Sequence, residues 1–259
     1  MNVPKFTVVL GLDAHTLPYF ATTCPSWKRF YPELWDAPWC VFYDPSQITA
    51  DEIKVASLDA SVRLVPWNGS QAGYESQRAK MLSGHVFISR MIETDYFLKI
   101  DADAIAVSRG EWPMAEWFVD RPVLVGPGWG YWRAKGSTMS LVEWCQVLED
   151  FGTRHFGTEP QGWEGRIGSW NHVKGPKLRD KNRFVSWLGF QRADWVRTMA
   201  DLFEADFGQG RLPVPSHDTS LWACAVRSDA LTRVISVKPS WTNRVTLRGC
   251  KREMEKLNE

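Results

Sequence analysis

The segment Phe6–Leu12 is a continuous run of apolar and β-branched residues, and it strongly constrains the fold. Such a run is expected for a strand that is buried on both faces, as in a parallel sheet covered by helices. Segments with strand-like and helix-like patterns alternate after it. The expected strands lie within residues 39–44, 62–67, 95–100, 121–130, 184–191 and 233–239, and the expected helices within 24–35, 74–92, 138–151, 192–207 and 216–229. This alternation predicts an α/β domain with a central, mostly parallel sheet flanked by helices.

Residues 152–183 interrupt the alternation. They are rich in Gly, Lys, Arg and Trp and have no helical or strand period. So long an irregular segment within a compact domain is usually functional or disordered. With 259 residues in all, we expect one domain that carries this segment as a loop.

Net charge and cysteine content bear on the partners of the protein and on its cellular compartment. The formal net charge of +1 provides no global attraction for nucleic acid, although the basic residues of 152–183 leave a nucleic-acid acceptor open. The five cysteines are scattered without a C-x-x-C pair, which favours a reducing compartment over a disulfide framework or a structural zinc site. The first apolar run ends at Asp13, too short for a signal peptide, and no segment predicts a membrane span. We expect a soluble, cytoplasmic protein.

Fifteen tryptophans are unusual for a chain of this length. Indole rings stack on the flat faces of sugars and bases, so the set permits a carbohydrate-binding module. The simpler interpretation of any one tryptophan is core packing. Both interpretations remain open at this point.

Two aspartates follow the expected strand at residues 95–100. Asp101 and Asp103 are separated by Ala102, and Ala104 and Ile105 return the chain to apolar character. In an extended chain, residues i and i+2 point the same way, so both carboxylates can face one point. Hard divalent cations such as Mn²⁺ and Mg²⁺ prefer oxygen ligands of this kind. The small alanines are expected to leave room for a ligand beside the metal.

The segment FLKIDADAIAV at residues 97–107 resembles the strand and D-x-D motif of nucleotide-sugar glycosyltransferases with the GT-A fold. The resemblance extends more loosely over residues 5–240. It implies a metal-dependent hexosyl- or pentosyltransferase whose Mn²⁺ or Mg²⁺ bridges the two phosphates of a sugar nucleotide, with a UDP-sugar as the expected donor. It also implies a single domain over residues 1–259, with a nucleotide-binding half at about 1–107 and an acceptor-binding half at about 108–245.

Other classes fit the aspartates less well. Phosphatases with D-x-D-x-[TV] carry the motif on their first strand and need Thr or Val where this chain has Ile105. Nucleotidyltransferases usually open with a Gly-rich basic loop after the first strand, and GLDAHTLPYF lacks the additional glycines and the lysine. A nucleotidyltransferase and a carbohydrate-binding module remain the alternatives to a glycosyltransferase.

The resemblance also implies donor-binding residues. The turn after the first strand wraps the base, the second strand ends in an acidic residue, and the helix before the D-x-D strand carries basic residues. The positions that match are Gly11, Asp13, His15, Asp44, Arg78, Lys80, Asp101 and Ala102. Asp44 can alternatively be a turn former, and Arg78 and Lys80 a solvated helix face.

The acceptor half is matched by fewer residues. Asp218 in VPSHDTSLW resembles the carboxylate that meets the acceptor hydroxyl, which makes it a candidate general base, or it can favour a helix N-terminus through the dipole. His217 is a candidate third metal ligand. Gly189 in SWLGFQR resembles a glycine that lets the backbone approach the donor sugar. Residues 152–183 are the expected acceptor loop, and the acceptor itself can be a carbohydrate, a protein or another molecule.

Overall fold

The computed structural model describes residues 2–57, 61–68, 77–106, 108–109, 115–127, 150–155, 188–209, 232–235 and 242–244. Its centre is a seven-stranded sheet in the order β3-β2-β1-β4-β7-β6-β8. The strands are β1 (Phe6–Leu12), β2 (Trp39–Tyr43), β3 (Val62–Pro66), β4 (Tyr96–Ile100), β6 (Leu124–Pro127), β7 (Leu188–Arg192) and β8 (Thr232–Ile235). A second pair joins β5 (Ala104–Ala106) to β9 (Thr242–Arg244) in antiparallel fashion.

The sheet is mostly parallel, as the sequence predicts. β1 pairs in parallel with both β2 and β4, and β2 pairs in parallel with β3. β7 is the exception, because it runs antiparallel to both β4 and β6. β4 is buried along its whole length, which explains why its sequence lacks polar alternation.

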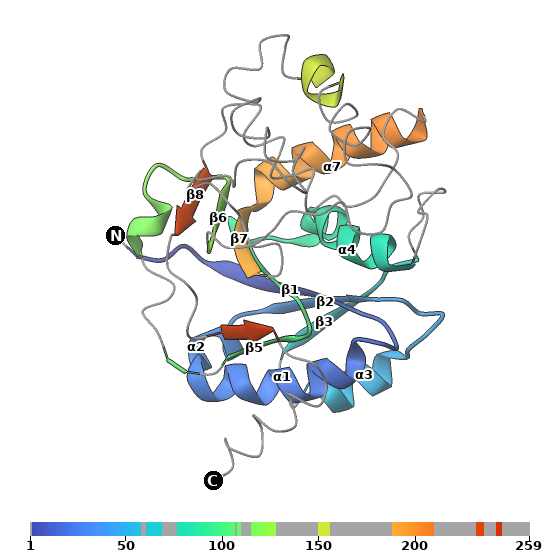
Figure 1. Ribbon diagram of the computed structural model, residues 1–259, viewed down its shortest axis with the longest axis vertical. Helices are drawn as coiled ribbons and strands as arrows, with labels where there is room; N and C mark the ends of the chain where they lie inside the picture. Colours follow the sequence, from blue (N-terminus) through green and yellow to red (C-terminus); the bar gives the residue numbers. More distant parts are fainter. Residues whose placement is uncertain are drawn as a thin grey trace, which may run out of the picture.

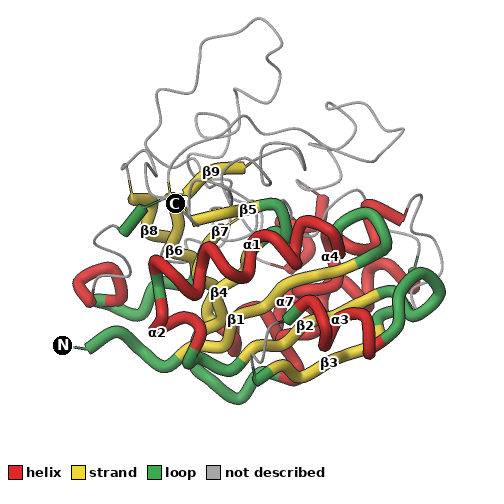
Figure 2. Tube along the Cα trace, turned by 90° about the horizontal axis from the view of Figure 1, so that it is seen from below, coloured by secondary structure: helices red, strands yellow, loops and turns green. Residues whose placement is uncertain are grey.

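Helices cover both faces of the sheet (Figure 1). One layer consists of α1 (Leu17–Phe30), α2 (Pro32–Trp35) and α3 (Ala50–Ala56). The opposite layer contains α4 (Gln77–Ile88), the short 3₁₀ turn η1 (Ser89–Met91) and α7 (Ala193–Gly208). A second 3₁₀ turn, η2 (Ala115–Phe118), precedes β6. Seen from below, α1 lies alongside β5, and the two elements are in contact (Figure 2). Within the described ranges, no helix is both long and apolar enough to cross a membrane.

Several predicted boundaries are wrong for identifiable reasons. The helix expected at residues 24–35 begins at Leu17, where Pro18 occupies the first turn, and it continues through Pro25. It ends at Tyr31, whose φ of −138° is not helical, and Pro32 then starts α2. Residues 150–155 are helical, so residues 152–155 do not belong to the irregular segment expected at 152–183.

α3 and the β5–β9 pair are not among the expected elements. The start of α3 nevertheless has a local signal: Thr49 Oγ1 accepts from the Glu52 N–H at 3.3 Å, and Glu52 Oε2 accepts from the Thr49 N–H at 2.7 Å. These two hydrogen bonds form a capping box. The hydrogen bonds that the Glu52 carboxylate accepts from the Thr49 N–H and from Thr49 Oγ1 hold the pKa of Glu52 below its usual value.

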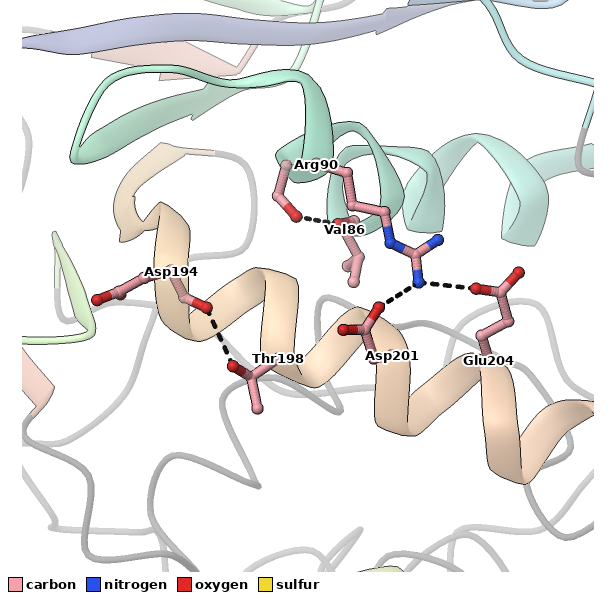
Figure 3. A network of polar contacts seen from close by, with 7 residues as sticks. Val86, Arg90, Asp194, Thr198, Asp201 and Glu204 are labelled. Atoms are coloured by element: carbon pink, nitrogen blue, oxygen red, sulfur yellow. Dashed lines mark hydrogen bonds and ion pairs between the residues drawn. The ribbon is translucent and has the colours of Figure 1, made fainter.

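Two ion-pair clusters attach α7 to its neighbours. Arg90 of η1 places Nη2 2.6 Å from Asp201 Oδ1 and 2.7 Å from Glu204 Oε2, and this cluster is exposed (Figure 3). Arg154 places Nη2 2.6 Å from Oδ2 of Asp206, which is fully buried. The second cluster therefore joins the helical residues 150–155 to the buried side of α7.

Candidate active site

The strand order creates a crevice between β1 and β4. From β1 the chain continues outward through β2 and β3, and it then returns to the other side of β1 to form β4. In open α/β sheets, ligands bind beyond the carboxyl ends of the strands at such a switch point. A pocket of about 480 Å³ opens there, which is within the usual range for small-ligand sites. Its lining residues are Val9, Leu10, Gly11, Asp13, His15, Thr16, Tyr19, Phe42, Gln47, Met81, Lys99, Ile100, Asp101, Ala102 and Asp103.

Both aspartates of the D-x-D motif line this pocket. They do so from a turn, because the Ala104 N–H donates to the Asp101 carbonyl at 3.0 Å. The extended conformation expected for Asp101 to Asp103 is therefore wrong, although both carboxylates still line one pocket. The turn reverses the chain directly after β4 and leads into β5.

α1 holds the backbone of this turn through buried side chains. Thr23 Oγ1 donates to the Ala102 carbonyl at 2.7 Å, and Trp27 Nε1 donates to the Ala104 carbonyl at 2.7 Å. Ser26 Oγ accepts from the Ala106 N–H at 3.1 Å. These bonds pair backbone groups that burial would otherwise leave without partners. The position of the aspartates is thus fixed by a helix far away in the sequence.

Ala102 and Ala104 do not both have the expected role of leaving room for a ligand. Ala102 lines the pocket, whereas Ala104 is fully buried in the core beneath α1. Small side chains are needed here because Trp27 must approach the Ala104 carbonyl closely. Ala104 therefore provides room for α1, and Ala102 alone of the pair borders the ligand space.

Lys99 is a site residue that the sequence analysis missed. Its side chain is only 7% exposed, and Nζ lies 2.8 Å from Asp101 Oδ1, whose side chain is 15% exposed. Both side chains line the pocket. A signal was present, since a lysine two residues before Asp101 interrupts a strand that is otherwise apolar. Burying such a charge is costly unless it is paired.

The turn between β1 and α1 forms another wall. Asp13 Oδ1 accepts from the Thr16 N–H and from Thr16 Oγ1, both at 2.8 Å, and Thr16 Oγ1 accepts from the Asp13 N–H at 2.8 Å. The exposed ring of His15 lies 5.8 Å from that of Tyr19, centroid to centroid, and both rings line the pocket. Gly11, Asp13 and His15 are therefore brought together, as expected.

Asp44 lies behind the pocket wall. It is 1% exposed, and its carboxylate accepts from Ser46 N–H at 3.0 Å, Ser46 Oγ at 2.6 Å and Gln47 Nε2 at 3.1 Å. These bonds shape the turn after β2, which matches the alternative interpretation of Asp44 as a turn former. Gln47 lines the pocket, so Asp44 orients a residue that the sequence analysis did not single out.

Phe42 packs between β1 and α4. A Cβ atom added to Gly11 or to Gly84 would overlap the Phe42 ring. The two glycines thus allow the ring to fill the space between strand and helix, and Phe42 and Met81 provide an apolar side of the pocket. The backbone of Arg78 and Lys80 lies in the first turn of α4, and the structure describes nothing of their side chains.

The remaining predicted site residues either do not line the pocket or lie outside the described residues. Gly189 of β7 pairs with Lys99 of β4 and is not among the pocket-lining residues. Asp218 and His217 lie outside the described part of the chain, as do the predicted helix 216–229 and residues 156–183. Within the described ranges, no three His, Cys, Asp or Glu side chains are grouped so that they could hold a metal ion.

Several of the described tryptophans are packed inside the protein. Trp27 and Trp39 are fully or almost fully buried, and Trp67 stacks on Phe87 with ring centroids 5.4 Å apart. None of the tryptophans in the described ranges lines the pocket. For Trp27, Trp39 and Trp67, core packing is the correct interpretation.

Comparisons with known proteins place this architecture in one fold class. No protein-family model and no curated protein sequence matches the chain. Among solved structures, the galactosyltransferase LgtC with donor and acceptor sugar analogues matches at a TM-score of 0.60 and 11% identity, over 96% of this chain and 94% of that one. Core-mannan synthase A from Aspergillus fumigatus, in an Mn/GDP form, matches at a TM-score of 0.56 and 11% identity, over 98% of this chain and 85% of that one. The mannosyltransferase Ktr4p from S. cerevisiae with GDP matches at a TM-score of 0.54 and 12% identity, over 89% of this chain and 67% of that one.

These matches define the class as the GT-A fold of nucleotide-sugar glycosyltransferases, which confirms the fold expected from the D-x-D segment. At 11–12% identity, the similarity is one of fold.

Proposed function

We propose that the protein is a glycosyltransferase that moves a sugar from a nucleoside-diphosphate sugar to an acceptor. The observation that carries the proposal is the pocket at the β1–β4 switch point, which is lined by Asp101 and Asp103 within a GT-A fold. A UDP-sugar is the expected donor, and GDP-sugars are the second choice because two of the similar structures contain GDP.

The charges of the pocket support a divalent cation. Among the residues that the structure describes, its lining includes the carboxylates of Asp13, Asp101 and Asp103 and one ammonium, that of Lys99. An anionic diphosphate would be repelled by such a surface unless a further cation accompanied it. Mn²⁺ or Mg²⁺ held by Asp101 and Asp103 fits this requirement, because both cations prefer carboxylate oxygens and keep positions for phosphate. When bound, the cation would neutralise charge that develops on the departing nucleotide.

The chain's own residues would orient the donor. The rings of His15 and Tyr19, with Phe42 and Met81, offer flat and apolar surfaces to a base. Gly11 and Ala102 contribute small residues to the pocket wall. The braced turn at residues 101–104 keeps both carboxylates in place before the donor binds, which lowers the entropic cost of binding.

The acceptor side of the proposal rests on the resemblance. Asp218 would remove the proton from the acceptor hydroxyl or orient that hydroxyl, and His217 would be a third metal ligand. Residues 152–183 would contribute to acceptor binding, and Gly189, Arg78 and Lys80 would border the donor. Replacing Asp218 with Asn tests this part, because sugar transfer should fall while nucleotide binding stays unchanged.

A thermal-shift screen tests the proposed donor class. Wild-type protein is heated with UDP, GDP, ADP or CDP, each with Mn²⁺ or with EDTA. A nucleotide at about a hundredfold excess over its Kd should stabilise the fold by about 2.7 kcal/mol, and EDTA should abolish the effect. If no nucleoside diphosphate shifts the transition under either condition, the proposed function is wrong.

A further inference from the structure

The ammonium of Lys99 occupies the pocket beside the proposed metal ligands. Nζ is 2.8 Å from Asp101 Oδ1, and Lys99 and Asp101 are both largely buried. The pocket lining also includes the carboxylates of Asp103 and Asp13, so the Lys99 ammonium shares one cavity with three carboxylates. The Asp101 carboxylate therefore already has a cationic neighbour within the protein.

The sheet accommodates Lys99 in a specific way. Lys99 pairs with Gly189 in the antiparallel β4–β7 ladder, and directly paired residues project from the same face of a sheet. Because Gly189 has no side chain, nothing from this position of β7 covers the lysine stem. The alternate residues Leu98 and Ile100 project into the core beneath α1 instead. Lys99 thus projects from the opposite face of β4 to Leu98, and its side chain lines the pocket.

We propose that Lys99 is a built-in counter-charge that makes metal binding depend on the donor's diphosphate. This inference rests on the proposed function. A divalent cation at Asp101 and Asp103 would lie close to the Lys99 ammonium, and like charges at such distances disfavour each other. The cation alone therefore binds weakly. The negative charges of the diphosphate offset both cations, so metal and nucleotide bind with strong positive coupling.

A purely structural ion pair makes a different prediction. If Lys99 only stabilises the fold, its replacement lowers the stability of the protein but leaves the ratio of metal affinities with and without nucleotide unchanged. If Lys99 opposes the metal, its replacement tightens the binding of metal alone and reduces the coupling. The two roles therefore separate in a binding experiment, and not in an activity assay.

The experiment measures free Mn²⁺ by its electron paramagnetic resonance signal. Wild-type protein, Lys99→Gln and Lys99→Arg are each titrated with Mn²⁺, with and without saturating UDP or GDP. Glutamine can still donate a hydrogen bond to Asp101 but carries no charge, whereas arginine keeps the charge. Lys99→Gln should bind Mn²⁺ alone at least about fivefold more tightly than wild type, with a matching loss of coupling, since coupling factors are typically about 5–150-fold. Lys99→Arg should resemble wild type.

The outcomes distinguish this inference from the proposed function. If wild type binds Mn²⁺ together with a nucleotide and the affinity of Lys99→Gln for Mn²⁺ alone rises less than about fivefold, the role of Lys99 is overturned and the proposed function stands. If wild type binds a nucleotide but binds Mn²⁺ neither alone nor with that nucleotide, this inference fails and the transfer of a sugar from a nucleotide donor still stands. If wild type binds neither Mn²⁺ nor any nucleotide, the proposed function fails, and this inference fails with it.

A measurement on the wild-type protein covers the case in which Lys99→Gln does not fold. The Lys99 ammonium is observed by ¹H–¹⁵N NMR and assigned with Lys99→Arg. Mg²⁺ together with UDP or GDP should shift this resonance, because its neighbour Asp101 becomes a metal ligand and a diphosphate approaches. An unchanged resonance in a complex that binds both ligands overturns the inference.

Discussion

Thr23 in the middle of α1 donates a buried 2.7 Å hydrogen bond to the carbonyl of Ala102, the residue between the two pocket aspartates. Residues 79 positions apart are thereby joined at the point where the chain leaves β4. Together with the Trp27–Ala104 bond, this contact makes α1 the support of the D-x-D turn. The geometry of the candidate metal ligands consequently depends on a residue that touches neither aspartate.

Replacing Thr23 with Val tests this support. Valine has nearly the same shape but cannot donate, so the buried Ala102 carbonyl loses its partner. Leaving a buried acceptor unsatisfied costs about 1–3 kcal/mol, and urea denaturation should show a loss of that size. The Mn²⁺-dependent affinity for nucleotide should fall as well. Thr23→Ser keeps the hydroxyl and is the matched control, so equal stabilities of the two variants would contradict the role of this bond.

Gly84 and Gly208 form a second comparison, because both lie in helices but differ in their surroundings. A Cβ on Gly84 would overlap the Phe42 ring and lie 3.0 Å from Trp67 Nε1, whereas nothing lies within 4 Å of a Cβ on Gly208. Overpacking usually costs about 1–3 kcal/mol, partly offset in a helix by the better propensity of alanine. Gly84→Ala should therefore lower the free energy of unfolding, and Gly208→Ala should leave it unchanged or raise it by up to about 1 kcal/mol. Similar effects of the two substitutions would show that α4 is not tightly packed against Phe42.

The two ion-pair clusters on α7 should differ in strength. Arg90 contacts Asp201 and Glu204 at the surface, where all three side chains are at least 37% exposed (Figure 3). Arg90→Met should therefore cost no more than about 1 kcal/mol. Arg154→Met removes the guanidinium that lies 2.6 Å from the buried Asp206 carboxylate, and His155, 3.2 Å from that carboxylate, is charged only when protonated. Its cost should be about 3 kcal/mol. Chemical denaturation measures the free energy of unfolding of both variants. A larger loss of that free energy for Arg90→Met than for Arg154→Met would refute this ranking.

Burial raises the pKa of the Cys40 thiol from its ordinary value of 9.0 to about 11. Because the folded state holds the proton more tightly, Cys40 contributes stability below pH 9 that is lost as the pH rises toward 11. At pH 8 its thiolate fraction should be about a hundredfold lower in the folded than in the unfolded chain, and so should its rate of alkylation by iodoacetamide. Peptide mass spectrometry with and without urea measures both rates. Rapid alkylation of Cys40 in the folded protein would contradict its burial.

Much of the fold follows from local sequence patterns. The apolar runs of β1 and β4 specify strands that must be covered on both faces, and this requirement leads directly to a helix-covered sheet. The D-x-D aspartates were predictable as neighbours at a pocket because they follow such a strand. The start of α3 was also predictable, since Thr49 and Glu52 have capping-box spacing, but its short length hides it from periodicity.

The remaining features depend on contacts between distant residues. β7 runs antiparallel to its neighbours β4 and β6, and nothing within Leu188–Arg192 encodes that direction. The hydrogen bond from Thr23 to the Ala102 carbonyl likewise joins residues that are far apart in the sequence. Lys99 could have been noticed as a charge within an apolar strand, but its partner depends on the turn that follows β4. The turn itself replaced the extended chain expected for residues 101–103.

Titration calorimetry of Asp103→Asn tests the central claim most directly. Wild type, Asp103→Asn and the control Asp51→Asn, whose carboxylate is exposed on α3, are titrated with UDP and with GDP in the presence of Mn²⁺ or EDTA. We expect wild type and Asp51→Asn to bind one of the nucleotides only with Mn²⁺. Asp103→Asn should bind it at least about tenfold more weakly, a loss of about 1.4 kcal/mol. Undiminished Mn²⁺-dependent binding by Asp103→Asn, or no nucleotide binding by wild type, would contradict a metal-assisted sugar-nucleotide site at the end of β4.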